Sequence, residues 1–433
     1  MRRRDFLRRS LGAGAGLFLP AQLLGCDGDP SPLDAGFDAH VEPRPDAGSP
    51  LDFRGLTKGP WVQLTSPGRA HLRFETYVDA AVPVRIGRAS GDDAPEAAQR
   101  GFDVRYERDA LGMAARLPDF AGRHVLHEVV LEDLAPGEQV EWTVTPAEGP
   151  PVSGSFLASP ETGTPFSFAW LADTSVPFSD PSVELVARHA PDLVLHGGDI
   201  TYAANPFDTW NAMMRGFSPI TQQAAFMVTI GNHEFDMAHE VDHMYDRLFG
   251  GQGAPGASPR HFAYTFGGIR FIHLDSETSS LATDAAQLAW LDAELEAARA
   301  DADVRFPVLA FHRPTYTFSR HAPGSLAQRE AVHTRCVEHG VPLVLAGHVH
   351  AYERFAVDGV TYLIDGGGGA VLYDPDEDLE DVRAARPEEI ALRQAASRSH
   401  GTTIAQVDAD GALTLTRYAA EDGAMQDRVV IMG

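Results

Sequence analysis

The sequence has little cysteine, few basic residues for its acidity, and few long apolar runs. Only two cysteines, Cys26 and Cys336, occur in 433 residues, which argues against a disulfide framework and excludes a Cys-rich zinc site. Lys and Arg number 35 against 61 Asp and Glu, a formal charge of −26. Because such a chain repels phosphate backbones, we expect no nucleic-acid partner. Beyond the first 25 residues no run of about 18 apolar residues occurs, so we expect no spanning segment there.

The first 25 residues have the pattern of an export signal. A basic stretch, 1–10, precedes an uncharged apolar stretch, 11–24, which is too short for a comfortable membrane span. Arg3-Arg4-Asp-Phe-Leu7 resembles a twin-arginine signal, and Leu23-Leu-Gly-Cys26 resembles the lipobox of bacterial lipoproteins. We therefore expect export to the periplasm or cell surface, with a lipidated Cys26 as the only attachment to a bacterial membrane. A plain leader with an incidental cysteine is the alternative.

Composition and strand spacing divide the rest of the chain into three parts. Residues 26–52 are rich in Asp, Pro, Gly and Ala, which predicts a disordered tether. Residues 53–160 hold short apolar or alternating runs bounded by turns, which predicts an all-β sandwich. Within them, Leu131-Glu-Asp-Leu-Ala-Pro-Gly-Glu138 resembles a turn of fibronectin type III-like modules. Residues 161–433 alternate apolar strands with helical patterns such as 284–300, which predicts α/β layering.

Five apolar strands of this last part each end in a potential metal ligand. The residues that follow them are Asp173, Asp199, Asn232, His312, and His348 with His350. One such residue alone is as readily a loop cap, but strand ends line one crevice in an open α/β sheet, so we expect these to converge. Carboxylate, carboxamide and imidazole donors without thiolate favour a hard or borderline ion. Two ions about 3.5–4 Å apart, bridged by one carboxylate, would use all the donors and suit displacement at phosphorus.

Taken in order, these blocks resemble the motifs of calcineurin-like metallophosphoesterases. The matching blocks are Asp173, Gly198-Asp-Ile-Thr-Tyr202, Gly231-Asn-His-Glu234, Val308-Leu-Ala-Phe-His312 and Gly347-His-Val-His350. Tyr202, three residues after Asp199, narrows the resemblance to the purple acid phosphatases, over about 55–433 of this chain. The resemblance implies an α/β (α+β) fold, a four-layer β-sandwich flanked by helices, preceded by the all-β fibronectin-like sandwich.

The same resemblance implies a role for each matched residue. The bridge between two metals would be Asp199. A ferric ion would be held by Asp173, Tyr202 and His350, and divalent iron, zinc or manganese would be held by Asn232, His312 and His348. Contact with the substrate, or assistance to the leaving group, would come from His233 and His321. A phenolate ligand suits Fe(III), because free tyrosine has a pKa of about 10 and only a strongly Lewis-acidic ion keeps it deprotonated. The implied reaction is hydrolysis of small phosphate monoesters by metal-hydroxide attack on phosphorus.

Two other functions stay open at this point. One is a phosphodiesterase or phospholipase on the same scaffold with a different metal pair. The other is a non-catalytic surface lipoprotein, which would require decayed ligands. The first block reads Ala172-Asp-Thr-Ser175 without the glycines usual in the family, and the charged segment 374–398, expected as a surface excursion, has no counterpart. These departures leave the substrate more open than the metal site.

Overall fold

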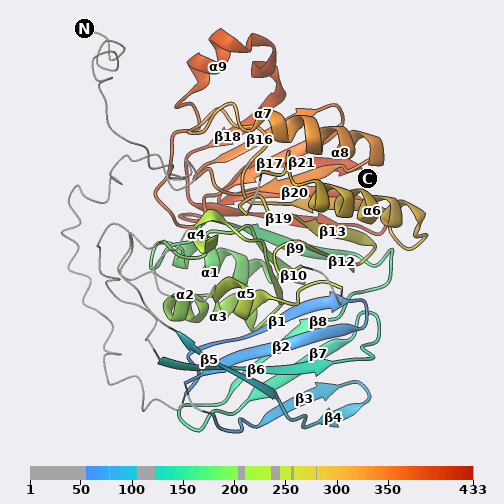
Figure 1. The fold of residues 1–433 in the computed structure, drawn as a ribbon, viewed down its shortest axis with the longest axis vertical. Helices are drawn as coiled ribbons and strands as arrows, with labels where there is room; N and C mark the ends of the chain where they lie inside the picture. Colours follow the sequence, from blue (N-terminus) through green and yellow to red (C-terminus); the bar gives the residue numbers. More distant parts are fainter. Residues whose placement is uncertain are drawn as a thin grey trace, which may run out of the picture. The chain divides into compact units, whose positions relative to one another are not determined.

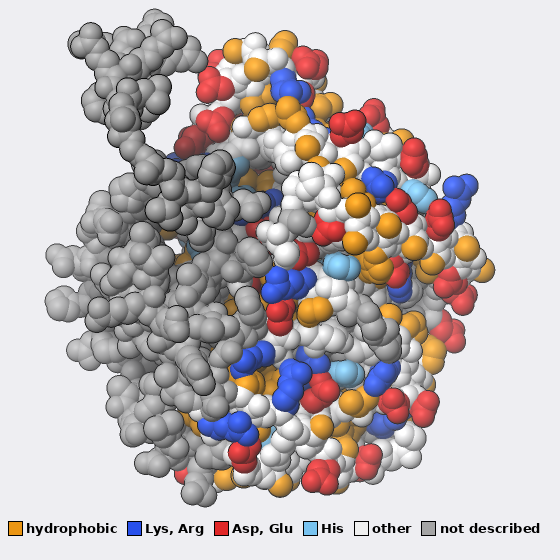
Figure 2. Space-filling view, viewed as in Figure 1, with side chains coloured by type: hydrophobic (Ala, Val, Ile, Leu, Met, Phe, Trp, Pro, Cys, Tyr) orange, Lys and Arg blue, Asp and Glu red, His pale blue; other side chains and the backbone are white. Residues whose placement is uncertain are grey.

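A computed structural model describes residues 55–77, 79–104, 122–202, 210–235, 244–254, 258–278 and 280–432. The expected leader, the tether and Cys26 lie outside these ranges. All described residues belong to one compact unit, Arg44–Gly433. Within the described ranges, every helix is too short or too polar to cross a bilayer. On the described part of the face in Figure 2, acidic and basic side chains intermingle.

The first part of the chain folds into two antiparallel four-stranded sheets, as its alternating runs predict. One sheet has the order β1-β2-β6-β5, and its strands are Lys58–Ser66, Arg69–Thr76, Gly122–Leu131 and Ala98–Val104. The other has the order β4-β3-β7-β8, and its strands are Gly91–Asp93, Val84–Arg88, Gln139–Val144 and Val152–Leu157. Leu72, Trp142 and Phe156 are buried in one core cluster. Figure 1 draws these strands in blue to teal, and they agree with the expected all-β region. Its fibronectin type III-like character stays a prediction.

The rest of the chain forms two larger sheets. The first has the order β11-β10-β9-β19-β20-β21; its strands are Ala225–Val228, Leu193–His196, Phe166–Leu171, Gly401–Val407, Ala412–Ala419 and Met425–Met432. The second has the order β12-β13-β14-β15-β17-β16-β18; its strands are Phe262–Phe266, Ile269–His273, Phe306–Ala310, Leu343–Ala346, Val360–Asp365, Tyr352–Val357 and Arg393–Ser397. β9, β10 and β11 pair in parallel, as do β13, β14, β15 and β17. The sequences of these parallel strands are continuous apolar runs because both faces of each sheet are covered by other parts of the protein.

Four layers result from the way the helices cover these sheets. The inner faces of the two sheets share one core, in which Trp170 and Leu195 belong to the same cluster as Phe271 and Val308. The outer face of the first sheet packs against α1 (Asp180–His189) and α2 (Trp210–Gly216). The outer face of the second packs against α6 (Ala285–Ala300) and α8 (Thr334–His339). Smaller helices among the described elements are α3 (Ser218–Thr221), α4 (Asn232–Phe235), α5 (Met244–Phe249), α7 (Leu326–Gln328), α9 (Leu379–Ala385) and a 3-10 helix, Pro387–Leu392.

Two local expectations need correction. The five ligand-bearing strands do not share one sheet, since β9, β10 and β11 belong to the first and β14 and β15 to the second. Between α7 and α8 the helical segment contains a π-helical turn, Arg329–His333, which was not predicted from the sequence. The segment 374–398 is not only a surface excursion, because its last strand, β18, pairs with β16 at the edge of the second sheet.

The N-terminal sheets also support the strand that leads to Asn232. Arg73 of β2 donates from Nη1 to the carbonyl oxygens of Leu248 and Gly250, at 3.0 and 2.6 Å. Two residues on, the Gln252 side chain pairs with both the amide and the carbonyl of Val228, at 2.8 and 2.9 Å. The Gln252 side chain therefore takes the hydrogen bonds that a neighbouring strand would make with the edge of β11. Val228, where these bonds form, lies four residues before the predicted ligand Asn232.

Candidate metal centre

The predicted ligands lie in the segments that follow the carboxyl ends of β9, β10, β11, β14 and β15, with Asn232 at the start of α4. Asp173, Asp199 and His348 have φ of 59°, 53° and 68°, and His321 has 75°. A non-glycine residue in this left-handed region costs about 1–2 kcal/mol, so such strain is found where the surroundings impose it. Four of the seven non-glycine residues with positive φ in the described ranges are thus predicted site residues.

The first group of donors surrounds the Tyr202 hydroxyl. This hydroxyl lies 3.0 Å from Asp173 Oδ1, 3.2 Å from Asp199 Oδ2 and 3.0 Å from His350 Nε2. His350 Nε2 in turn lies 3.4 Å from Asp173 Oδ1. Two carboxylates, a phenol and an imidazole nitrogen therefore converge on one point, as the sequence predicts.

The second group shares Asp199 with the first. His312 Nε2 lies 3.2 Å from Asp199 Oδ2 and 3.1 Å from Asn232 Oδ1. His348 offers a ring nitrogen within 4.8 Å of the ligand atoms of Asp199 and His312. Asp199 Oδ2 is thus the atom at which the two groups of donors meet. All seven predicted ligands belong to one or both groups.

Backbone carbonyls fix the tautomers of two of these histidines. His312 Nδ1 donates to the Gly197 carbonyl, and His350 Nδ1 donates to the Val371 carbonyl, each at 2.8 Å. A carbonyl oxygen only accepts, so Nδ1 carries a proton in both residues and each Nε2 points into its donor group. Metal-binding histidines are commonly oriented in this way.

Glycines leave the space in which these ligands crowd together. A Cβ on Gly347 would lie 2.6 Å from Asp173 Oδ2, and one on Gly366 would lie 2.7 Å from the same oxygen. Gly198 has a φ of 94°, and a Cβ there would lie 2.8 Å from His312 Nδ1. Gly198 therefore allows the backbone before Asp199 to approach His312 closely.

Glu234 holds the two central loops together. Its Oε2 accepts from the amides of Asp199 and Gly231, each at 2.8 Å, and its Oε1 accepts from the amide of Ile200 at 2.6 Å. The residue is 7% exposed. Burial and the Asp199 carboxylate raise the pKa of Glu234 to about 8. No role for Glu234 was predicted from the sequence, although this residue completes the Gly-Asn-His-Glu block.

The two predicted substrate-side histidines flank the donor groups. His233 Nε2 lies 3.9 Å from Asp199 Oδ2, and its ring centre is 4.2 Å from that of Tyr202. The His321 ring stacks on His348 with centres 4.7 Å apart. The His233 side chain is 24% exposed, so this side of the donor groups is open to solvent. Both histidines are therefore near enough to meet a molecule bound at the donors.

Two residues that the sequence analysis did not assign also border the site. Arg313 donates from Nη1 to His348 Nε2 at 3.0 Å and from Nε to Glu277 Oε2 at 2.8 Å. Tyr373 stacks on His350 with ring centres 4.2 Å apart. The sequence signal for Arg313 is its place directly after His312.

The charges and donor types of this site fit a pair of cations. Burial lowers the pKa of His312, but the Asp199 carboxylate more than reverses this and the pKa rises to about 10. The surrounding acids therefore favour positive charge at His312. Burial, and next the charges of Asp173 and Asp199, raise the pKa of Tyr202 well above its usual range. A phenolate at this point requires a strongly Lewis-acidic ion, and the mixed oxygen and nitrogen donors suit hard or borderline metals.

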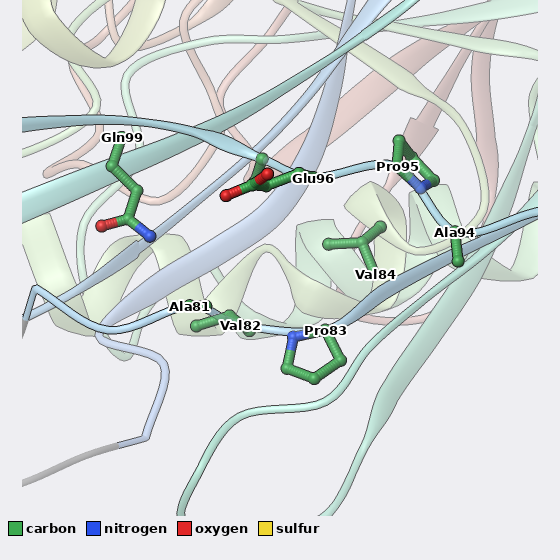
Figure 3. Close-up of a pocket in the computed structure, with 9 residues that line it drawn as sticks. Ala81, Val82, Pro83, Val84, Ala94, Pro95, Glu96 and Gln99 are labelled. Atoms are coloured by element: carbon green, nitrogen blue, oxygen red, sulfur yellow. The ribbon is translucent and has the colours of Figure 1, made fainter.

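A hollow in the N-terminal sheets has no such chemistry. Its lining, shown in Figure 3, consists of residues 81–84, 94–97 and 99. Glu96 is the only ionisable side chain among them. The donor groups beside Asp199 are therefore the stronger candidate for function.

Comparison with known proteins places part of this chain among the calcineurin-like phosphoesterases. Residues 168–352 match the family model described as "Calcineurin-like phosphoesterase". "Probable purple acid phosphatase 20" of Arabidopsis thaliana is 27% identical over 365 residues, which cover 80% of this chain and 80% of that protein. "Probable inactive purple acid phosphatase 9" of the same plant is 28% identical over 204 residues, 40% of this chain but only 31% of that protein.

A solved structure has a similar fold. The purple acid phosphatase PPD1 from seeds of yellow lupin (Lupinus luteus) superposes with a TM-score of 0.71 at 17% identity, covering 86% of this chain and 74% of that one. Identity this low supports the fold alone. The predicted layered α/β metallophosphoesterase fold is confirmed, whereas the residue roles depend on the geometry of this chain.

Proposed function

Because this chain is a purple acid phosphatase-like, calcineurin-like phosphoesterase, we propose that it hydrolyses phosphate monoesters at a binuclear metal centre. The observation that carries the proposal is that two donor groups meet at one atom, Asp199 Oδ2. A bridging carboxylate of this kind is what a pair of closely spaced ions requires.

The proposed ligand sets follow the two donor groups. Asp173, Asp199, Tyr202 and His350 would hold Fe(III), and Asn232, His312, His348 and Asp199 would hold divalent Fe, Zn or Mn. When bound, the two ions would acidify a water and stabilise negative charge on the phosphoryl oxygens. Asn232 is neutral, so the second set carries less negative charge and leaves more attraction for a phosphate oxygen.

The chain's own groups would then orient the ester and handle the proton of the leaving group. His233 and His321 flank the donor groups on either side, within reach of a phosphate ester held there. We assign them to hydrogen bonds with the phosphoryl oxygens and to protonation of the departing alkoxide. His350 and His312 are held by backbone carbonyls, so they keep the orientation in which Nε2 faces the donor groups.

The test uses purified full-length protein with measured metal content. We expect p-nitrophenyl phosphate to be hydrolysed faster than bis-p-nitrophenyl phosphate. Asn232→Ala and His312→Ala should each lower kcat by about 100-fold or more, because removal of one group that stabilises developing charge costs about this factor. His339→Ala, a histidine on α8 outside both donor groups, serves as control. A faster diester would favour the phosphodiesterase alternative, and undiminished hydrolysis by both ligand variants would support a non-catalytic role for the site.

We also propose export with a lipidated Cys26, which rests on the leader sequence alone. Membrane fractions should contain the wild-type protein, and Cys26→Ser should release it into the soluble exported fraction. Lysine at both Arg3 and Arg4 should block export if the twin-arginine route is used. Normal export of that double variant would contradict the route, and a membrane-bound Cys26→Ser protein would contradict the anchor.

A further inference from the structure

Arg313 carries the only arginine guanidinium with a hydrogen bond to a proposed ligand side chain in the described ranges. It directly follows His312 and reaches His348 Nε2 through Nη1, at 3.0 Å. Its side chain is 33% exposed, whereas that of its partner Glu277 is 1% exposed. The guanidinium is therefore held from the inside by a buried carboxylate while part of it faces solvent beside the centre.

The anchor of this arginine is itself well ordered. Glu277 Oε2 accepts from Arg313 Nε at 2.8 Å, and Glu277 Oε1 accepts from the Ser276 hydroxyl at 2.7 Å. The Ser276 hydroxyl also accepts from the Arg313 backbone amide at 3.1 Å. The Glu277 amide donates to Asp275 at 2.8 Å. The stem and Nε of Arg313 are thus fixed, and the end of the guanidinium is the part that can change partners.

The contact between Arg313 and His348 cannot coexist with a cation on this histidine. If Nε2 binds the cation, its lone pair is no longer available to Nη1. If Nδ1 binds it, the proton must be on Nε2, which then donates and cannot accept. Either way, Nη1 loses its acceptor. Within the described ranges, Nη2 has no hydrogen-bond acceptor in this structure, so Nη1 and Nη2 would then both be available as donors beside His348.

A guanidinium beside two bound cations would be repelled by them, and an anion placed between the guanidinium and the cations would offset this repulsion. Glu277 offsets part of this charge from behind, but the exposed edge of the guanidinium lies on the side of His348 and His321. A phosphoryl group matches that edge, since two parallel N–H donors bind two of its oxygens in one plane. A monoester has three non-bridging oxygens and up to two charges, whereas a diester has two oxygens and one charge. The monoester therefore gains more from this third cationic partner.

We propose that Arg313, anchored by Glu277, binds the phosphoryl group of the substrate and makes the site prefer a monoester to a diester. This inference deepens the proposed phosphatase function and rests on it for the identity of the reaction. It assigns Arg313 to phosphate recognition and Glu277 to the positioning of Arg313.

The first measurement is binding of inorganic phosphate to metal-loaded protein by calorimetry. Arg313→Met keeps the length of the side chain without its charge, and we expect the Kd of phosphate to rise about 10- to 100-fold, the usual worth of a charge-assisted hydrogen bond. Arg313→Lys should recover part of the loss, because it restores the charge but not the paired donors. Arg335→Met is the matched control, since Arg335 pairs with Asp292 on the outer helices.

The second measurement is Zn²⁺ binding to metal-stripped protein. Arg313 holds a lone pair of His348 and adds positive charge, so Arg313→Met should bind Zn²⁺ as tightly as wild type or more tightly. A purely structural role for Arg313 predicts weaker Zn²⁺ binding instead. Weaker phosphate binding together with weaker Zn²⁺ binding would therefore overturn the proposal.

The third measurement separates this proposal from the proposed function. In Arg313→Met, the ratio of kcat/KM for p-nitrophenyl phosphate to that for bis-p-nitrophenyl phosphate should fall about tenfold. If wild type hydrolyses neither ester but its phosphate binding depends on Arg313, the phosphatase function fails and the phosphate-binding assignment stands. If wild type hydrolyses the monoester while Arg313→Met leaves the ratio and phosphate binding unchanged, the assignment to Arg313 fails and the phosphatase function stands.

Discussion

Replacing Glu234 with alanine removes the acceptor that three backbone amides share. Those amides belong to Ile200, Gly231 and the proposed bridging residue Asp199. Each buried donor left without a partner costs about 1–3 kcal/mol. If water that enters the small cavity satisfies one of the three, two donors stay without a partner and the loss is about 2–6 kcal/mol. The amides fix the backbone at Asp199 and before Asn232, so the loss acts directly on both donor groups.

An opposing effect reduces this loss when the centre holds no cations. Burial and the Asp199 carboxylate raise the pKa of Glu234, which means that the protein destabilises the ionised form of this side chain. Removing it relieves that repulsion. Bound cations neutralise Asp199 and leave little repulsion to relieve. We therefore expect Glu234→Ala to lower the free energy of unfolding by about 2–6 kcal/mol with metal and by clearly less without it.

Urea denaturation followed by circular dichroism measures both values, on metal-loaded and metal-stripped protein. Glu330→Ala is the control, because Glu330 is exposed and such a change alters stability by about 0.5 kcal/mol at most. Glu234→Gln keeps one oxygen, so its loss of unfolding free energy should lie between the losses of Glu234→Ala and Glu330→Ala. Equal losses with and without metal would refute the electrostatic part of the reasoning. A Glu234→Ala protein as stable as the control in both states would refute the hydrogen-bond part.

Three further outcomes follow from the same structure. Tyr202→Phe should abolish the visible absorption of the iron-loaded protein, measured per bound iron, and an unchanged band would contradict phenolate ligation. Gly347→Ala adds a Cβ 2.6 Å from Asp173 Oδ2, so metal titration should show affinity reduced about tenfold or more, as expected for overpacking of about 1–3 kcal/mol. Burial raises the pKa of Glu75, but Lys58 and a neighbouring histidine outweigh it and hold the pKa at about 2. Because this folded-state pKa lies below the unfolded value, the stability it confers is present above about pH 4.5 and is lost as the pH falls toward 2. Thermal melts from pH 7 to 3 should show this loss, and it should be absent from the Lys58→Met, Glu75→Gln double variant.

The strand ends that bring the proposed ligands together could be predicted because each signal is local in the sequence. A short apolar run with a donor a few residues after it, as at Leu195 and Asp199, identifies a strand end without knowledge of its neighbours. That the first three and the last two of these strands lie in different sheets could not be predicted from the runs themselves. Parallel buried strands are all apolar runs, and nothing in such a run tells which strand is its partner.

The contact by which Glu277 positions Arg313 could not be predicted from the sequence, for a related reason. Glu277 and Arg313 are 36 residues apart and meet only because β13 and β14 are parallel neighbours whose ends lie together. The edge strand Arg393–Ser397 was missed because its sequence, Arg-Gln-Ala-Ala-Ser, lacks the branched and aromatic residues of a typical strand. Backbone pairing with β16 determines its conformation, which is a tertiary effect.

The left-handed backbone at four site residues has a consequence for protein engineering. Asp173, Asp199, His321 and His348 all have a positive φ, and glycine adopts such a conformation without the steric cost that these side chains bear. A library of this protein selected only for thermal resistance would therefore tend to replace residues of the centre and to lose its chemistry on the way. Any stabilisation campaign should hold these four positions constant and seek its gains elsewhere in the chain.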